Sequence, residues 1–213
     1  MAALIDAAKA YVAEVFSHDA SGHDVFHTLR VMHLAEHLAE KEGADRETVQ
    51  LAALLHDVDD RKLFPETHRN QGRARAFLRD QGVDEARTEA ICRIIAAISF
   101  KGTDTVAPDT LEGQCVQDAD RLDAIGAIGV ARAFAFGGAR GRKMYDPAEP
   151  PVLRMDAAAY AQNQGHTINH FYEKLLLLKD MMNTPSARVL AEARHKYMEA
   201  FLAEFYDEWQ GKK

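Results

Sequence analysis

The chain has 213 residues and a formal net charge of −7 at pH 7, with 47% hydrophobic and 28% charged residues. This composition is typical of a folded globular protein and argues against intrinsic disorder. A negative net charge disfavours duplex nucleic acid as the main partner, because phosphate backbones are bound by clustered Lys and Arg. No apolar run approaches the roughly 20 residues of a membrane-spanning helix. We therefore expect a soluble, cytoplasmic protein without a membrane partner.

Hydrophobic residues recur with helical spacing along most of the chain, which predicts an all-α fold. The expected helices cover about 1–16, 25–42, 45–55, 68–80, 84–98, 114–136, 165–182 and 186–209. Residues 137–155 are rich in Gly, Pro and basic side chains, so we expect a long and mobile irregular loop there. We expect one helical bundle over residues 1–213, with core motifs at about 20–136 and C-terminal helices at about 165–209 packing on it.

The two cysteines, Cys92 and Cys115, lie in apolar segments and form no CxxC pair. Buried free thiols in a reducing compartment are the expected state.

Histidine is concentrated in one part of the chain. Seven of the ten histidines lie between His18 and His68, and histidine both titrates near neutral pH and binds metals. His33 and His37 lie among charged residues and are expected on a solvated helix face. Solvated or structural roles are also expected for His18, His68, His166 and His195.

The strongest local signal is the pair His56-Asp57, which ends an apolar helical run. An imidazole and a carboxylate placed together at the end of an apolar helix are costly unless a group such as a divalent metal compensates both. A polar helix end in solvent is the alternative interpretation. Upstream, His27 lies near the start of a helix between Phe26 and Leu29, which are expected in the core, so His27 can point into a cleft.

A third group of polar residues follows in a largely apolar segment. Asp118, Asp120 and Asp123 lie between Cys115 and Gly129, and carboxylates in such a helix need partners. Solvent exposure or pairing with Arg121 is the alternative to metal binding.

His27, His56-Asp57 and the segment from Ala119 to Leu122 resemble, in this order and at these separations, the HD-domain superfamily of metal-dependent phosphohydrolases. Residues 22–24, 98–102, 118–129, 141–147 and 168–175 also resemble one bacterial subgroup of this superfamily, and some members of that subgroup resemble nucleotide pyrophosphohydrolases. The resemblance covers roughly residues 20–205.

The resemblance implies an all-helical fold whose metal ligands are His27, His56, Asp57 and Asp120. Asp118 is the alternative to Asp120 as the fourth ligand. Two nitrogen and two oxygen ligands suit Mn²⁺ first, with Fe²⁺, Co²⁺, Ni²⁺, Mg²⁺ and Zn²⁺ as alternatives. Asp60 takes the position of the acid that orients the attacking water in related nucleotidases and alarmone hydrolases.

The remaining expected site residues are those that contact substrate. His23 is expected to donate a proton to the leaving oxygen, and Lys62 to offset charge during the reaction. Cations and hydrogen-bond donors are needed on the phosphate oxygens, and the candidates are Arg30, Lys101, Arg140, Arg142, Lys143, His170 and Lys174.

The expected activity is hydrolysis of a phosphate ester or phosphoanhydride in a small phosphorylated substrate, with a nucleotide favoured. A di-iron HD oxygenase is one alternative, with His23, Asp60 and His68 as spare ligands. A non-catalytic nucleotide-binding HD module is the other. A monomer and a homo-oligomer are both compatible with the sequence.

Overall fold

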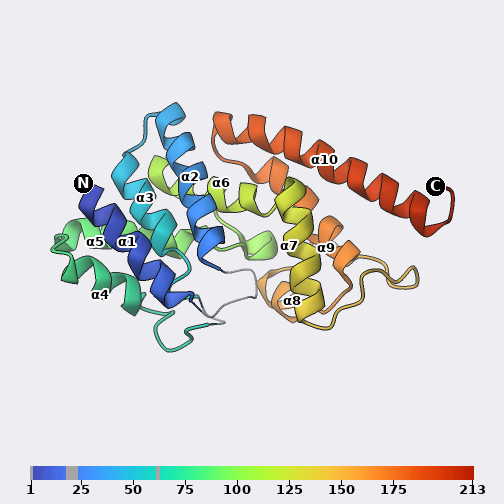
Figure 1. The fold of residues 1–213 in the computed structure, drawn as a ribbon, viewed down its shortest axis with the longest axis horizontal. Helices are drawn as coiled ribbons and strands as arrows, with labels where there is room; N and C mark the ends of the chain where they lie inside the picture. Colours follow the sequence, from blue (N-terminus) through green and yellow to red (C-terminus); the bar gives the residue numbers. More distant parts are fainter. Residues whose placement is uncertain (1, 18–23, 61–62) are drawn as a thin grey trace. The chain divides into compact units, whose positions relative to one another are not determined.

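The computed structural model describes residues 2–17, 24–60 and 63–213, and within these ranges it contains helices and loops but no strand (Figure 1). The all-α prediction is therefore confirmed. Backbone contacts divide the chain into two compact units. The N-terminal unit comprises Met1–Phe100 and Val106–Asp120, and the C-terminal unit comprises Lys101–Thr105 and Arg121–Lys213.

The N-terminal unit is built around one apolar helix, α3. Its members are α1 (Ala2–Val15), α2 (Val25–Glu42), α3 (Arg46–Leu55), α4 (Gly72–Asp80), α5 (Glu85–Ile98) and most of α6 (Leu111–Asp123). Helix α3 packs against α1, α2 and α5. Its residues 51–55 are all completely buried, as expected for a helix end that is apolar on every side. This buried helix delivers His56-Asp57 directly after Leu55.

The C-terminal unit contains η1 (Gly102–Asp104), α7 (Gly126–Ala139), α8 (Ala157–Gln162), α9 (Thr167–Glu173), η2 (Leu175–Met181) and α10 (Pro185–Trp209). Helix α7 packs against α9 and α10, and η2 packs against both α9 and α10. Thr184 caps α10 by accepting a hydrogen bond from the N–H of Ala187, and Pro185 occupies the first turn, where no N–H is needed.

The helix expected over 114–136 is instead two helices. The chain turns at residues 124–126, where Gly126 has φ 77 and is buried against the stem of Arg194. The positive φ favours glycine, because a side chain is strained in that conformation. Arg194 donates to the carbonyl of Leu122, and Arg132 pairs with Asp123 at 2.6 Å. Asp123 therefore has a structural partner.

The helix expected over 165–182 also breaks, at Lys174. The following residues form the 3₁₀ helix η2, in which Leu175 and Leu178 are buried. Three residues per turn place these two leucines on one face, so the break keeps both in the core.

The segment expected as a mobile loop is extensively bonded to α9. The carbonyls of Lys143 and Met144 accept hydrogen bonds from the first two residues of α9, Thr167 and Ile168, at 3.0 and 3.1 Å. Residues 137–139 belong to α7, and α8 follows the segment. These bonds hold the basic stretch after α7 against one end of α9.

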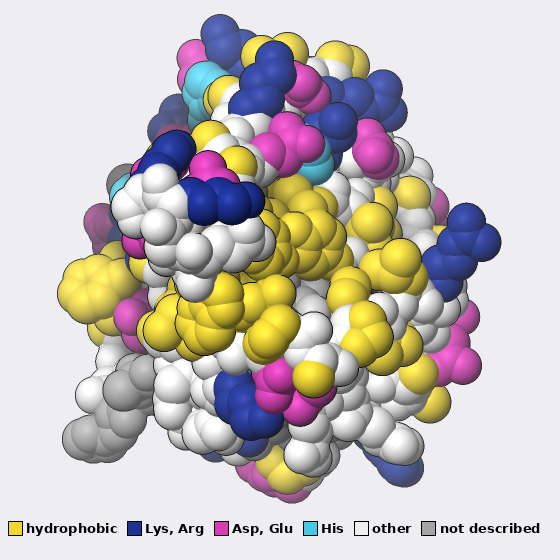
Figure 2. All heavy atoms as spheres, turned by 90° about the vertical axis from the view of Figure 1, so that its right-hand side faces the viewer, with side chains coloured by type: hydrophobic (Ala, Val, Ile, Leu, Met, Phe, Trp, Pro, Cys, Tyr) yellow, Lys and Arg dark blue, Asp and Glu magenta, His cyan; other side chains and the backbone are white. Residues whose placement is uncertain are grey.

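An aromatic cluster joins the same segment to α10. Tyr145 makes edge contacts with Phe205, Tyr206 and Trp209, at ring-centroid distances of 5.8, 5.5 and 5.0 Å. Trp209 is half exposed, and Met144 and Leu153 are also exposed. Figure 2 shows hydrophobic side chains gathered beside one another on one face of the molecule. Contiguous apolar surface of this kind is suited to protein contacts.

Among the described residues, no single helix is long and apolar enough to cross a membrane. Helices α6 and α7 meet the length and composition criteria only when taken together.

Candidate metal centre

His56 terminates α3 and is oriented by that helix. Its Nδ1 lies 2.7 Å from the carbonyl oxygen of Ala53, so Nδ1 carries the proton that the carbonyl accepts. The side chain is 4% exposed. A backbone acceptor on one ring nitrogen fixes both the tautomer and the ring orientation of a metal-binding histidine. The other nitrogen, Nε2, is thereby left to face Asp57.

His27 is placed by the first turn of α2. Asp24 caps this helix, and its Oδ1 accepts a hydrogen bond from the N–H of His27 at 2.7 Å. The imidazole of His27 is 1% exposed. Its ring centroid lies 5.4 Å from that of His56, with the two planes at 74°. Two buried imidazoles from different helices therefore face a common point.

Two carboxylates complete the group. Asp57 Oδ2 lies 3.5 Å from His27 Nε2 and 3.3 Å from His56 Nε2. Asp120 Oδ1 lies 3.6 Å from His27 Nε2 and 3.9 Å from His56 Nε2. Ligands bound to one ion at about 2.1 Å lie roughly 3 Å or slightly more from each other. The separations here match that spacing.

The charges of this group also favour a cation. Nε2 of His56 is buried and makes no hydrogen bond. Burial lowers the pKa of His56, but the carboxylates of Asp57 and then Asp120 outweigh burial and raise the pKa to about 9. The carboxylates beside His56 therefore favour a positive charge at this point of the structure. His27, His56 and Asp57 each present a ligand atom, all within 4.8 Å of one another.

Asp120 and Asp118, the two alternatives for the fourth ligand, have different surroundings. Asp120 faces both histidines, and its side chain is 31% exposed. Asp118 is completely buried and contributes to raising the pKa of Cys115. The geometry favours Asp120 as the fourth ligand.

Asp60 lies in the turn that follows the histidine–aspartate pair. Its N–H donates to the carbonyl of Asp57 at 3.0 Å, and its own carbonyl accepts from Phe64 at 2.7 Å. Asp60 therefore lies in a hydrogen-bonded turn that begins at the candidate ligand Asp57.

Sequence reasoning did not single out Asp59, which anchors the same turn. Its side chain is almost completely buried and accepts hydrogen bonds from the N–H groups of Arg73 and Ala74, at 3.1 and 3.0 Å. Asp59 therefore ties the turn to the first residues of α4. His68 Nδ1 bonds the carbonyl of Asp59 at 3.0 Å, which gives His68 a structural role. The long loop between Asp59 and α4 hides this connection from sequence patterns.

The expected site residues have three kinds of surroundings. His23 and Lys62 lie outside the described residues. Arg30 is half-buried on α2, one turn after His27. The other five cations and His170 belong to the C-terminal unit.

The basic residues after α7 make contacts within the C-terminal unit. Arg140 and Arg142 lie over the ring of Phe136, at 5.4 and 5.6 Å from its centroid. Lys143 pairs with Asp146 at 2.6 Å, and its pKa is raised mainly by that hydrogen bond. Lys174 lies 5.8 Å from the ring centroid of Tyr160. Lys101 is exposed beside η1, and His170 is half-buried in α9.

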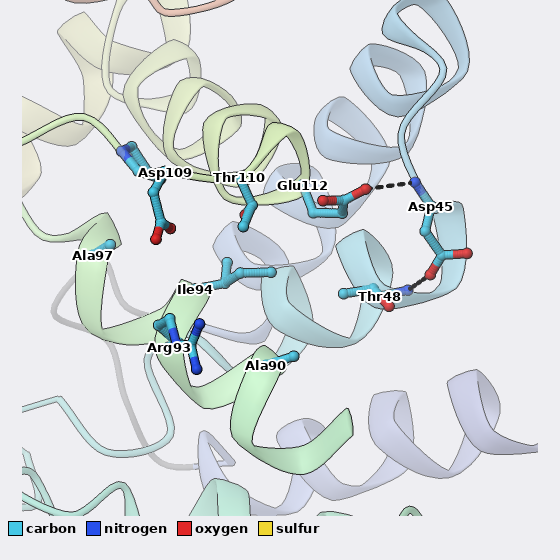
Figure 3. Close-up of a pocket in the computed structure, with 10 residues that line it drawn as sticks. Asp45, Thr48, Ala90, Arg93, Ile94, Ala97, Asp109, Thr110 and Glu112 are labelled. Carbon is cyan, nitrogen blue, oxygen red and sulfur yellow. Dashed lines mark hydrogen bonds between the residues drawn. The ribbon is translucent and has the colours of Figure 1, made fainter. Parts of the chain in front are cut away.

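A cavity of about 260 Å³ opens elsewhere in the N-terminal unit, between the start of α3, α5 and the start of α6 (Figure 3). Ile94 forms part of its apolar wall, and Arg93, Asp109 and Glu112 contribute charge. Glu112 accepts a hydrogen bond from the N–H of Asp45. None of the four candidate metal ligands is among the described residues that line this cavity.

Known proteins share both the sequence and the fold. The HD domain family matches residues 25–125. YpgQ from Bacillus subtilis is 41% identical over 196 residues, which cover 91% of this chain and 88% of YpgQ. A crystal structure from Lactobacillus plantarum has a TM-score of 0.88 at 40% identity and covers 99% of both chains.

Two further crystal structures carry functional information about the proteins they represent. An HD-superfamily hydrolase from Bacillus thuringiensis has a TM-score of 0.74 at 42% identity, with coverage of 97% of this chain and 96% of that one. YpgQ in complex with ADP has a TM-score of 0.76 at 38% identity, with coverage of 96% and 97%. On its sequence, its fold and its histidine–aspartate group, the chain belongs to the HD-domain family.

Proposed function

We propose that the protein is a metal-dependent phosphohydrolase that cleaves a phosphate ester or phosphoanhydride, with a nucleotide as the favoured substrate. The observation that carries the proposal is the convergence of His27, His56, Asp57 and Asp120, whose facing atoms lie 3.3–3.9 Å apart in the pairs between histidine and aspartate. The ADP complex of the relative YpgQ supports a nucleotide as ligand.

The four side chains would hold one divalent cation, with Mn²⁺ favoured over Fe²⁺, Co²⁺, Ni²⁺, Mg²⁺ and Zn²⁺. A bound divalent metal supplies Lewis-acid chemistry that makes water a nucleophile near neutral pH. The Ala53 carbonyl keeps the His56 ring in the orientation that ligation requires. Asp57 and Asp120 supply the negative charge that makes the site selective for a cation.

Protein side chains carry the remaining steps. Asp60 would orient the attacking water and accept its proton, since it lies in the hydrogen-bonded turn that follows His56-Asp57. His23 would protonate the leaving oxygen, and Lys62 would offset its charge. Arg30 would contact the phosphate oxygens from α2. Lys101, Arg140, Arg142, Lys143, His170 and Lys174 are the further residues proposed to bind the substrate.

The competing functions differ in metal content and turnover. A di-iron oxygenase needs ligands for a second ion. Among the described residues, one group of three potential ligands, His27, His56 and Asp57, has its ligand atoms within 4.8 Å of one another. A nucleotide-binding module without activity binds but releases no product. One metal per chain together with product release excludes both.

The test is a screen of nucleoside monophosphates, nucleoside triphosphates and sugar phosphates against Mn²⁺, Co²⁺, Ni²⁺ and Mg²⁺. Phosphate and pyrophosphate are quantified separately, so the screen also identifies the bond that is cleaved. The proposal predicts metal-dependent release of one of them from at least one nucleotide. No release with any metal, in protein confirmed to bind one metal per chain, would contradict it.

A further inference from the structure

Phe26 is exposed at a position where the sequence predicts a core residue. It lies in the first turn of α2, directly before the buried His27, yet it is 65% exposed. A large aromatic side chain that is mostly exposed gains little burial energy, and it contributes to binding when a ligand packs on it. Departures from hydrophobic patterning of this kind concentrate at functional sites.

The position of Phe26 on α2 relates it to two other residues. Successive helical residues differ by about 100° around the axis, which places Arg30 about 40° from Phe26, on the side of His27. Helical side chains lean toward the N-terminus, so the side chain of Arg30 extends over the turn that carries Phe26 and His27. Around the start of α2, the order is therefore metal ligand, cation, aromatic ring.

This order matches the parts of a nucleotide. The metal and the guanidinium suit the phosphates, and an exposed ring suits a planar base, since base–aromatic stacking is favourable for every base. We propose that Phe26 is the stacking surface for the base of a nucleotide substrate. The inference rests on the proposed function and adds a specificity: preference for nucleotides over base-free phosphates, with little discrimination among bases.

The first test compares the binding of ATP and inorganic tripolyphosphate by calorimetry, with Ca²⁺ present to limit turnover. Phe26→Ala should weaken ATP binding by about tenfold or more, because stacking is worth that much per base. It should leave tripolyphosphate binding unchanged. Phe26→Trp should restore ATP binding, since it keeps an aromatic face. Tyr197→Ala, which removes an exposed aromatic ring of α10, is the matched control.

The same variants are then compared by KM and kcat with ATP, GTP, CTP and UTP. The proposal predicts a raised KM for all four in Phe26→Ala, with unchanged metal content and unfolding temperature. Equal affinity of Phe26→Ala and parent for ATP would overturn the proposal, as would equal losses of affinity for ATP and tripolyphosphate. If Phe26→Ala instead changes the oligomeric state of the protein and still binds ATP like the parent, Phe26 serves a contact between chains and the proposal is also wrong.

Failure of the stacking role is distinguishable from failure of the proposed function. If the parent protein hydrolyses ATP and Phe26→Ala does so with the same KM, only the stacking role is wrong. If the parent releases no product from nucleotides, the phosphohydrolase proposal fails, and absence of ATP binding in the parent also refutes the stacking role.

Discussion

The Ala53 carbonyl oxygen lies 2.7 Å from Nδ1 of His56, and this single contact sets the orientation of the imidazole. Both residues belong to the end of α3, whose preceding turn is completely buried. A ligand held by a rigid buried helix loses little freedom on binding an ion. The candidate centre is therefore positioned by the core of the N-terminal unit.

Loss of a candidate ligand should remove the metal without unfolding the protein. His27→Ala leaves a carboxylate pair with one imidazole, so the expected result is at least a tenfold loss in metal affinity. Metal content after dialysis, measured by mass spectrometry, checks this. His33→Ala changes an exposed histidine of the same helix and should retain the parent's metal content. Equal retention by both variants would contradict the assigned site.

The pKa of His56 predicts how pH affects the metal-free protein. Its folded pKa of about 9 lies above the usual value of 6.5, so its contribution to stability is fully present below about pH 6.5. That contribution is lost as the pH rises through about 9. Denaturant unfolding of the metal-free protein should therefore show falling stability across this window, and His56→Gln should flatten the dependence. A parent and variant with parallel profiles would be inconsistent with the raised pKa.

Both thiols should be inert in the native protein. Burial, before any nearby charge, raises the pKa of Cys92 to about 11 and that of Cys115 to about 12. Reaction with disulfide reagents requires the thiolate. At pH 8 the thiols of the native protein should react very slowly with a disulfide reagent, whereas both thiols of the denatured chain should react at once. Rapid labelling of either cysteine under native conditions would be evidence against this burial.

Two adjacent glycines of α7 should respond oppositely to alanine. A Cβ on Gly137 would lie 2.2 Å from Oγ1 of Thr167, whereas a Cβ on Gly138 meets nothing within 4 Å. Gly137→Ala should lower the free energy of unfolding by about 1–3 kcal/mol, as overpacking does. Gly138→Ala should be neutral or stabilise by up to about 1 kcal/mol. Denaturant titration of both variants decides whether α7 and α9 pack as described.

Much of the fold and the centre of the site could be predicted from local patterns. Helix α5 and the boundaries of α10 follow hydrophobic spacing with capping residues, which are local signals. His56-Asp57 is conspicuous because it interrupts an apolar run. The break at Gly126 was not predicted, since it depends on packing against Arg194 from a distant helix.

The rest of the site depends on tertiary structure. Asp120 and Asp118 have similar sequence surroundings, and only the packing of α6 distinguishes the one that faces the histidines. Phe26 fits a core pattern but is exposed, so its assignment to the core was wrong. The buried bonds of Asp59 to α4 span a loop without any pattern.

Nucleotide hydrolysis and bound metal should be measured in the same samples of parent, Asp57→Asn and Asp60→Asn. The metal-loaded parent should release phosphate or pyrophosphate. Asp57→Asn should lose both metal and activity. Asp60→Asn should keep the metal but lose activity by roughly 10²–10⁴-fold, the usual contribution of a general base. Hydrolysis by Asp57→Asn at the parent's rate would show that the reaction does not depend on a metal held by His27, His56, Asp57 and Asp120.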